Sequence, residues 1–100
     1  MIDWDRIVGF DRDAGNARKN VDRHDVSQAE AEQVFFNESL LTVPDVRHSA
    51  GERRIHALGR TDDGRLLHVT FTLRQSDTKL RVISARDMSR RERSHYEQDT

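Results

Sequence analysis

The stretch IHALGRTDDGRLLHVTFTL, residues 55–73, decides the fold because it contains two strand patterns joined by a turn signal. From Leu66 to Leu73, apolar and polar residues alternate with the period of two that a strand with one buried face requires. The run Thr61-Asp62-Asp63-Gly64 separates this segment from Ile55–Leu58, and its Asp-Gly pair favours a tight hairpin turn. The stretch therefore predicts an antiparallel hairpin, whose buried face consists of Leu67, Val69, Phe71 and Leu73.

Two further segments have strand patterns. Leu80–Ala85 is apolar on both faces, as expected for a central strand that helices cover on at least one side, and Arg81 is its exception. Leu40–Val43 is apolar and β-prone, but Pro44 lacks a backbone N–H and is expected to end it. From Pro44 through Gly51 the chain is polar, which predicts a loop.

A helix is predicted near the N-terminus. It follows Ile7–Phe10, an apolar run that is compatible with a short strand. Asp11 and Asp13 offer N-caps for this helix, which we expect to run to about His24. Its narrow apolar stripe, expected to face the core, consists of Ala14, Ala17 and Val21.

Two capping boxes mark the starts of further helices. In each box a serine oxygen and a glutamate side chain satisfy two backbone N–H groups that the first helical turn leaves without partners. Ser27-Gln28-Ala29-Glu30 predicts a helix that runs through Phe35 and ends near Asn37, with Ala31, Val34 and Phe35 buried. Ser89-Arg90-Arg91-Glu92 predicts a short basic helix that reaches about Tyr96, after which the polar tail is expected to fray.

The order of these elements predicts an α+β fold: two helices, an antiparallel sheet of about four strands, and a short C-terminal helix. A chain of 100 residues is long enough for one compact core and too short for two. We therefore expect residues 1–100 to form a single domain.

Charge is distributed unevenly along the chain. The formal net charge is −1, but residues 1–45 hold ten acidic and five basic side chains, whereas residues 46–100 hold twelve basic and eight acidic ones. Arginine supplies nearly all of the positive charge, since Lys19 and Lys79 are the only lysines. A guanidinium presents a planar fork of donors that suits bidentate contact with phosphate. This composition favours an anionic partner; the alternative is that the arginines merely solvate a small surface.

Several classes of site are excluded by residues that the sequence lacks. It has no cysteine, no Gly-rich phosphate loop, no HExxH motif and no nucleophile elbow. The five histidines lack the spacing of a metal site, so we expect neither a metal nor a cofactor. No apolar run approaches the roughly 18 residues of a membrane span, and Asp3 and Asp5 stand where a secretory signal would be basic. We therefore expect a cytoplasmic location without membrane contact.

The remaining polar residues suit cleavage of RNA without a metal. That reaction needs a base for the 2′-hydroxyl proton, an acid for the leaving oxygen, and cations beside the crowded phosphorus. The candidate catalytic residues are Lys19, His24, Glu52, Arg54, Arg81 and Arg86. The candidate RNA-binding residues are Arg53, Arg60, Arg90, Arg91, Arg93 and Tyr96.

Most of these candidates also have a structural interpretation. Arg81 interrupts an apolar strand, so a salt bridge to Glu92 or Glu32 is the alternative to phosphate contact. His24 suits a helix-terminating hydrogen bond as well as an acid, and the simplest role of Glu92 is in its capping box. The arginines near Glu92 suit a solvated helix face equally well.

The chain is similar to the BrnT family of toxins over roughly residues 7–97. In the front half, the similarity lies in residues 9–11 (GFD), 16–20 (NARKN), 24, 26–27 (VS) and 30–35 (EAEQVF). In the rear half, it lies in residues 56–61 (HALGRT), 64–69 (GRLLHV), 81–88 (RVISARDM), 90–93 (RRER) and 96. The pattern RxISARxxxxxE, from Arg81 to Glu92, is the most specific of these motifs.

This resemblance implies a RelE-like fold and a metal-independent ribonuclease that lowers translation. It also implies a partner, a BrnA-type antitoxin with a DNA-binding ribbon–helix–helix domain, and contact with operator DNA only through that antitoxin. The polar positions of the family fall here on Lys19, His24, Glu52, Arg54, Arg81, Arg86, Glu92 and Tyr96.

The chain departs from the family pattern at three positions. Arg23 stands where the family has a lysine, and it keeps the positive charge. Arg12 stands where the resemblance leads us to expect tryptophan, so a large aromatic that could pack the core or stack on a base is missing. Asp25 stands where the family has a glycine that suits a left-handed helix C-cap, a conformation that aspartate adopts at some cost. These changes raise the possibility of an attenuated toxin.

Two other functions compete with the ribonuclease. One is a catalytically silent module that binds an antitoxin and acts in operon autorepression. The other is direct DNA binding through the basic half, which is weaker because nothing in the chain resembles a recognition helix. If an acidic antitoxin segment docks on the basic face, it is expected to cover Arg81 and Arg86.

Overall fold

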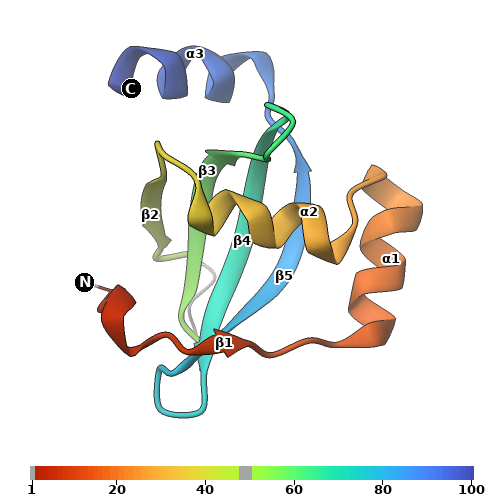
Figure 1. The fold of residues 1–100 in the computed structure, drawn as a ribbon, viewed down its shortest axis with the longest axis vertical. Helices are drawn as coiled ribbons and strands as arrows, with labels where there is room; N and C mark the ends of the chain where they lie inside the picture. The colour runs from red at the N-terminus through yellow and green to blue at the C-terminus, as the bar shows by residue number, and fades with distance from the viewer. Residues whose placement is uncertain (1, 48–50) are drawn as a thin grey trace.

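The computed structural model describes residues 2–47 and 51–100 and shows an α+β fold, as expected (Figure 1). One mixed sheet has the strand order β1-β5-β4-β3-β2. Its strands are β1 (Gly9–Phe10), β2 (Leu41–Asp45), β3 (Arg54–Arg60), β4 (Leu66–Arg74) and β5 (Lys79–Asp87). The helices are α1 (Ala14–His24), α2 (Gln28–Gln33) and α3 (Arg90–Asp99), with the short 3₁₀ turns η1 (Trp4–Arg6) and η2 (Val34–Phe36).

The β3–β4 hairpin forms as predicted. Its turn is closed by hydrogen bonds from Thr61 N to Arg65 O and from Gly64 N to Thr61 O, both 2.9 Å. Gly64 adopts a φ of 85°, a conformation that glycine reaches without steric cost. β2 and β5 pair antiparallel on either side of the hairpin, so the four expected strands are confirmed.

A fifth strand makes the sheet mixed rather than antiparallel. β1 pairs in parallel with the start of β5, where Gly9 lies opposite Lys79 and Phe10 opposite Leu80. The expectation of an antiparallel sheet of about four strands was therefore incomplete. The pairing joins residues about seventy positions apart, and a two-residue strand has no local pattern that reveals its partner or its direction.

Several boundaries differ from the prediction. β2 continues through Pro44 to Asp45, because β2 is an edge strand in which a missing N–H breaks no ladder hydrogen bond. The second helix ends at Gln33 and continues as η2, so it is shorter than expected. α3 runs to Asp99, so the tail predicted to fray is helical, and His95 Nε2 lies 3.2 Å from Asp99 Oδ2 one turn further on. Within the described residues, no helix combines the length and apolar character needed to cross a membrane.

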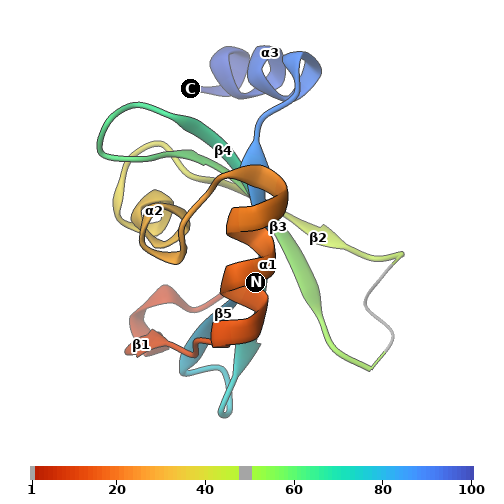
Figure 2. The same ribbon diagram turned by 90° about the vertical axis from the view of Figure 1, so that its right-hand side faces the viewer.

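The core lies between α2 and the sheet. α2 crosses the front of β3, β4 and β5 in Figure 1, and Figure 2 shows it end-on at one side of the sheet, with α3 beyond the end of the strands. Of the predicted buried face of β4, Leu67, Val69 and Phe71 are fully buried, and Leu73 packs partly buried against them. The α2 side contributes Val26, Ala31 and Val34.

A bulge in β5 determines where its polar side chains point. Thr70 of β4 lies opposite Ser84, and Phe71 lies opposite Val82, so Ile83 is an extra residue without a partner of its own. The core side chains of β5 are accordingly Leu80, Val82 and Ala85, with one spacing of three instead of two. Arg81 lies opposite Thr72 and Arg86 opposite His68, which places both arginines on the face away from α2.

α1 is attached to the sheet by asparagines rather than by its apolar stripe, which corrects the prediction. Val21 is 42% exposed, Ala14 is exposed and Ala17 is only partly buried. Asn16 Nδ2 donates to the carbonyls of Val82 and Ile83 (3.2 and 2.7 Å), and the Ala85 N–H donates to Asn20 Oδ1 (2.8 Å). β1 covers only the start of β5, so these amides satisfy backbone groups that no neighbouring strand binds.

Candidate functional site

The sheet face opposite α2 carries a row of polar side chains across β3, β4 and β5. The strand register places His56 opposite Thr70, and His68 opposite Arg86. The imidazole rings of His56 and His68 lie next to each other, with centroids 4.8 Å apart. We name His56, His68, Arg86 and Glu92 the histidine–arginine cluster.

Both nitrogens of His56 have partners. Its Nε2 lies 2.9 Å from Asp45 Oδ2 on the edge strand β2, and its Nδ1 lies 2.9 Å from Thr70 Oγ1 on β4. Because one contact comes from each neighbouring strand, the ring is fixed in position and orientation. His56 in turn forms one wall against which the ring of His68 packs.

Arg86 and Glu92 form a bidentate ion pair beside the histidines. Arg86 Nη1 and Nη2 donate to Glu92 Oε1 and Oε2 at 2.8 and 2.9 Å. Glu92 also accepts a hydrogen bond from Ser89 N in the capping box that begins α3. The Arg86 hydrogen bonds, with a further contribution from the capping bond, lower the pKa of Glu92 to about 2. Glu92 therefore stays ionised and holds Arg86 in place, while the Arg86 side chain remains 38% exposed.

His68 is held in its neutral form by its surroundings. Its side chain is only 13% exposed, and burial is the main cause that lowers its pKa. The nearby charge of Arg86 lowers the pKa further, while Glu92, whose Oε2 lies 3.8 Å from His68 Nε2, acts in the opposite direction. A neutral imidazole next to a guanidinium can accept a proton from a group that the guanidinium binds.

A second polar site lies further along the same face. A pocket of about 190 Å³ is lined by Asp13, Asn16, Glu52, Arg54, Arg81, Val82 and Ile83, and we name it the Arg81 pocket. Arg81 Nη2 lies 3.2 Å from Asp13 Oδ2, so Arg81 does have a salt bridge, but with neither of the predicted partners. Glu32 instead binds Arg12, and Glu92 binds Arg86.

The structure divides the predicted catalytic residues into groups. Glu52, Arg54 and Arg81 line the Arg81 pocket. The pKa of Asp13 is lowered, mainly by the hydrogen bond from Asn16 N, and the charge of Lys19 contributes to this shift. Lys19 is therefore close enough to influence the Arg81 pocket. Arg86 belongs to the histidine–arginine cluster. His24 lies at the opposite end of α1 from Asp13, about 16 Å along the helix.

The predicted RNA-binding residues are more dispersed. Arg90 and Arg91 line a shallow groove on α3, and Arg93 is exposed on the same helix. Arg60 is exposed at the end of β3, whereas Arg53 lines a different pocket with Ile55, a core-facing residue. Tyr96 is buried, and its hydroxyl donates to the carbonyl of Ser39 at 2.6 Å, which ties α3 to the segment before β2.

Sequence reasoning missed His56, His68, Asp45 and Asp13 as members of these sites. One signal was available: in the alternation of β4, His68 falls on the face opposite the core residues. The partners of these residues come from other strands or from α1, and no sequence spacing indicates them. Among residues 2–47 and 51–100, no group of three histidine, aspartate or glutamate side chains has an arrangement that could hold a metal ion.

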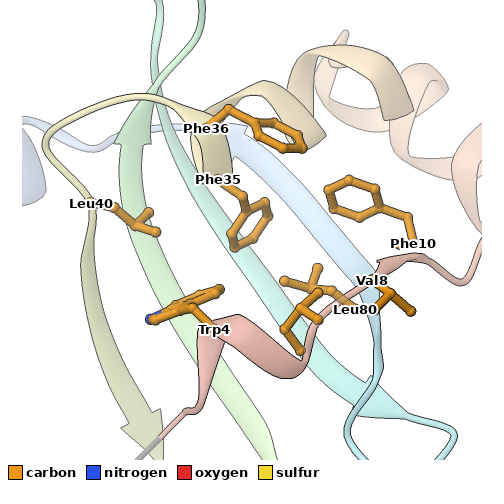
Figure 3. Close-up of a pocket in the computed structure, with 9 residues that line it drawn as sticks. Trp4, Val8, Phe10, Phe35, Phe36, Leu40 and Leu80 are labelled. Carbon is orange, nitrogen blue, oxygen red and sulfur yellow. The ribbon is translucent and has the colours of Figure 1, made fainter.

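An apolar pocket of about 390 Å³ lies on the α2 side of the sheet (Figure 3). In the close-up, Trp4 of the N-terminal segment lies across the opening from Phe35 and Phe36, with Leu40 on one side and Phe10 and Leu80 on the other. None of the residues that line this pocket in the described part of the chain has an ionisable side chain.

Residues 13–92 match the family model for the ribonuclease toxin BrnT of type II toxin–antitoxin systems. A search of curated proteins gives no match. The fold is similar to the 1.1 Å crystal structure of the Brucella abortus ribonuclease toxin BrnT, with a TM-score of 0.63 and 21% identity over 82% of this chain and 97% of that one. The chain therefore belongs to the BrnT family of ribonuclease toxins of type II toxin–antitoxin systems.

Proposed function

We propose that this chain is an endoribonuclease that cleaves RNA without a metal ion and that its chemistry takes place at the histidine–arginine cluster. The observation that carries this proposal is the largely buried imidazole of His68, which lies directly opposite the guanidinium that Glu92 holds in place on Arg86. His68 supplies a proton acceptor and Arg86 a cation, which are two of the three groups that phosphodiester cleavage by an internal hydroxyl requires.

In this reaction, the 2′-hydroxyl of a ribose attacks the adjacent phosphorus, and the bond from phosphorus to the 5′-oxygen breaks. The 5′-oxygen takes a proton from water and leaves as a hydroxyl, so the other product ends in a 2′,3′-cyclic phosphate. Arg86 is the group that binds the phosphate and stabilises the charge that develops on its oxygens. His68 accepts the proton of the 2′-hydroxyl, and its lowered pKa keeps it ready to do so at neutral pH. His56, fixed by Asp45 and Thr70, and Glu92, bound to Arg86, act as positioning residues.

The partner of this chain is a protein antitoxin, as its membership of a type II family implies. We propose an antitoxin of the BrnA type with a ribbon–helix–helix domain, through which alone the complex contacts operator DNA. An acidic segment of that antitoxin would cover Arg81 and Arg86, because both arginines lie on one face. A toxin–antitoxin complex that leaves both side chains exposed would contradict this arrangement.

The proposal is tested by incubating the purified chain with RNA in the presence of EDTA. We expect cleavage to persist with EDTA and to fall by about 10²-fold or more in Arg86→Ala, a loss typical of removing one group that stabilises developing charge. Arg18→Ala is the matched control, because this exposed arginine points away from β5 on α1. Thermal unfolding of each variant checks that the fold is retained.

Three outcomes would overturn parts of the proposal. Loss of cleavage with EDTA would show that the reaction depends on a metal. Full activity of a folded Arg86→Ala variant would place the chemistry elsewhere. An inactive wild type that still binds its antitoxin would favour the silent binding module, a function compatible with the full engagement of Arg86 by Glu92.

A further inference from the structure

We propose that the Arg81 pocket is a second phosphate subsite, which binds a backbone phosphate of the same RNA strand whose scissile phosphate lies at Arg86. This inference rests on the proposed ribonuclease function and names how the substrate is held. In this arrangement Arg81 binds substrate but does not touch the scissile phosphate.

The bulge in β5 brings the two sites onto one surface. Arg81 and Arg86 are five positions apart, and in a regular strand an odd separation would place them on opposite faces. The extra residue Ile83 brings both arginines to the same face. Arg81 lies opposite Thr72 and Arg86 opposite His68, two residues of β4 that share one face. Because Ile83 is an extra residue, the two arginines span only the four residue steps from His68 to Thr72, and at roughly 3.3 Å per residue their Cα atoms are about 13 Å apart along the strand. This is longer than one nucleotide step, so the two arginines would hold phosphates that are not adjacent.

The chemistry of the Arg81 pocket suits a phosphate. Arg54 and Arg81 both line it, and Lys19 adds positive charge close to Asp13. Of the two carboxylates in the lining, Glu52 is bound to Arg74 at 2.9 Å. Asp13 therefore remains as the anion beside Arg81, and that carboxylate occupies the place that a phosphate oxygen would take.

Hydrogen bonds hold the floor of the pocket in place. Asn16 Nδ2 binds the carbonyls of Val82 and Ile83, which fixes α1 against the bulge of β5. Asp13 Oδ1 accepts the N–H of Asn16 as the N-cap of α1, so the carboxylate beside Arg81 is held by the same helix. The Arg81 side chain is 26% exposed, which leaves its guanidinium accessible to a ligand. A site that is already ordered loses little conformational entropy when it binds.

The test is the salt dependence of binding to an RNA oligonucleotide methylated at every 2′-oxygen, which cannot be cleaved. Each phosphate contact with a single strand contributes about 0.7 to the slope of log affinity against log salt. We expect Arg81→Ala to reduce this slope by about 0.7, Arg81→Lys to restore most of it, and the control Arg18→Ala to leave it unchanged. With a methylated dinucleoside monophosphate, which has a single phosphate, Arg81→Ala should have no effect.

A second variant removes the competing anion. Asp13→Asn keeps a good N-cap for α1 but takes the negative charge away from Arg81. We expect it to bind the oligonucleotide more tightly than the wild type, with an unchanged affinity for the dinucleoside monophosphate.

Two results with Arg81→Ala would overturn the subsite: an unchanged salt dependence of oligonucleotide binding, or an equal loss of affinity for the oligonucleotide and the dinucleoside monophosphate. Failure of Asp13→Asn to tighten oligonucleotide binding would overturn it too, as would a wild type that does not bind the oligonucleotide. These binding results are independent of cleavage. The ribonuclease proposal can therefore fail while the subsite stands, and the subsite can fail while Arg86 remains essential for cleavage.

Discussion

Replacing Glu92 by glutamine separates the two roles of that side chain. Glu92 completes the capping box of α3 and forms the ion pair with Arg86. Glutamine at the same position preserves the capping box, because its carbonyl oxygen can accept the Ser89 N–H. The substitution removes only the negative charge from Arg86, so it measures the contribution of the ion pair.

The pKa of Glu92 sets the magnitude of the expected effect. A pKa lowered from 4.5 to about 2 corresponds by linkage to at most about 3.4 kcal/mol of stability at neutral pH. The Glu92 and Arg86 side chains are 24% and 38% exposed, and solvent screening reduces the contribution of such a pair. We therefore expect Glu92→Gln to lower the free energy of unfolding by about 1–2 kcal/mol at pH 7.

The effect should depend on pH in one direction. A carboxylate whose pKa is lower in the folded state stabilises the fold above its unfolded pKa, and this stabilisation is lost as the pH falls toward the folded value. The difference between wild type and Glu92→Gln should therefore be largest at neutral pH and shrink between pH 4.5 and about 2.

Urea unfolding followed by circular dichroism, from pH 7 down to about pH 3, measures this difference. Glu97→Gln is the matched control, since Glu97 is an exposed carboxylate on the same helix. A destabilisation by Glu92→Gln that stayed constant over this range would refute the assignment of the effect to the ion pair.

Three other substitutions test the fold by their effect on the midpoint of urea unfolding. Gly59→Ala would place a Cβ 2.9 Å from Val34 Cβ, so we expect a loss of about 1–3 kcal/mol; full stability would mean that η2 moves freely away from β3. Asp25→Gly should stabilise by about 0.5–1 kcal/mol, because Asp25 is the C-cap of α1 with φ 55° and ψ 41°; a loss would point to a role for its carboxylate. Asn20→Ala should destabilise by about 1–2 kcal/mol because it leaves the buried Ala85 N–H without its acceptor, and an unchanged midpoint would show that α1 is not anchored by this bond.

The elements with a local signature were predictable from the sequence. Both capping boxes are present, with reciprocal hydrogen bonds at Ser27 and Ser89, because each is formed within four consecutive residues. The β3–β4 hairpin follows from its period of two and its Asp-Gly turn. The left-handed C-cap at Asp25, expected from the resemblance, is confirmed as well.

The site was less predictable because long-range contacts determine its composition. Arg12, noted only as a departure from the family pattern, binds Glu32 through Nε and Nη2, and Gln28 completes the environment of this buried carboxylate. His56 gains its role from Asp45 and Thr70, which lie on the two neighbouring strands. A pattern within one segment cannot indicate such partners, since they depend on the register between strands.

The bulge at Ile83 links the docking of α1 to the arrangement of the polar face. The extra residue turns Arg81 and Arg86 to the same side of the sheet, and the carbonyls of Val82 and Ile83 at this point both accept hydrogen bonds from Asn16. The asparagine that anchors α1 therefore also stabilises the irregularity that positions the two arginines. It follows that a change at Asn16 should alter RNA binding through the position of Arg81, even though the Asn16 amide is already bound to the backbone and contributes no charge.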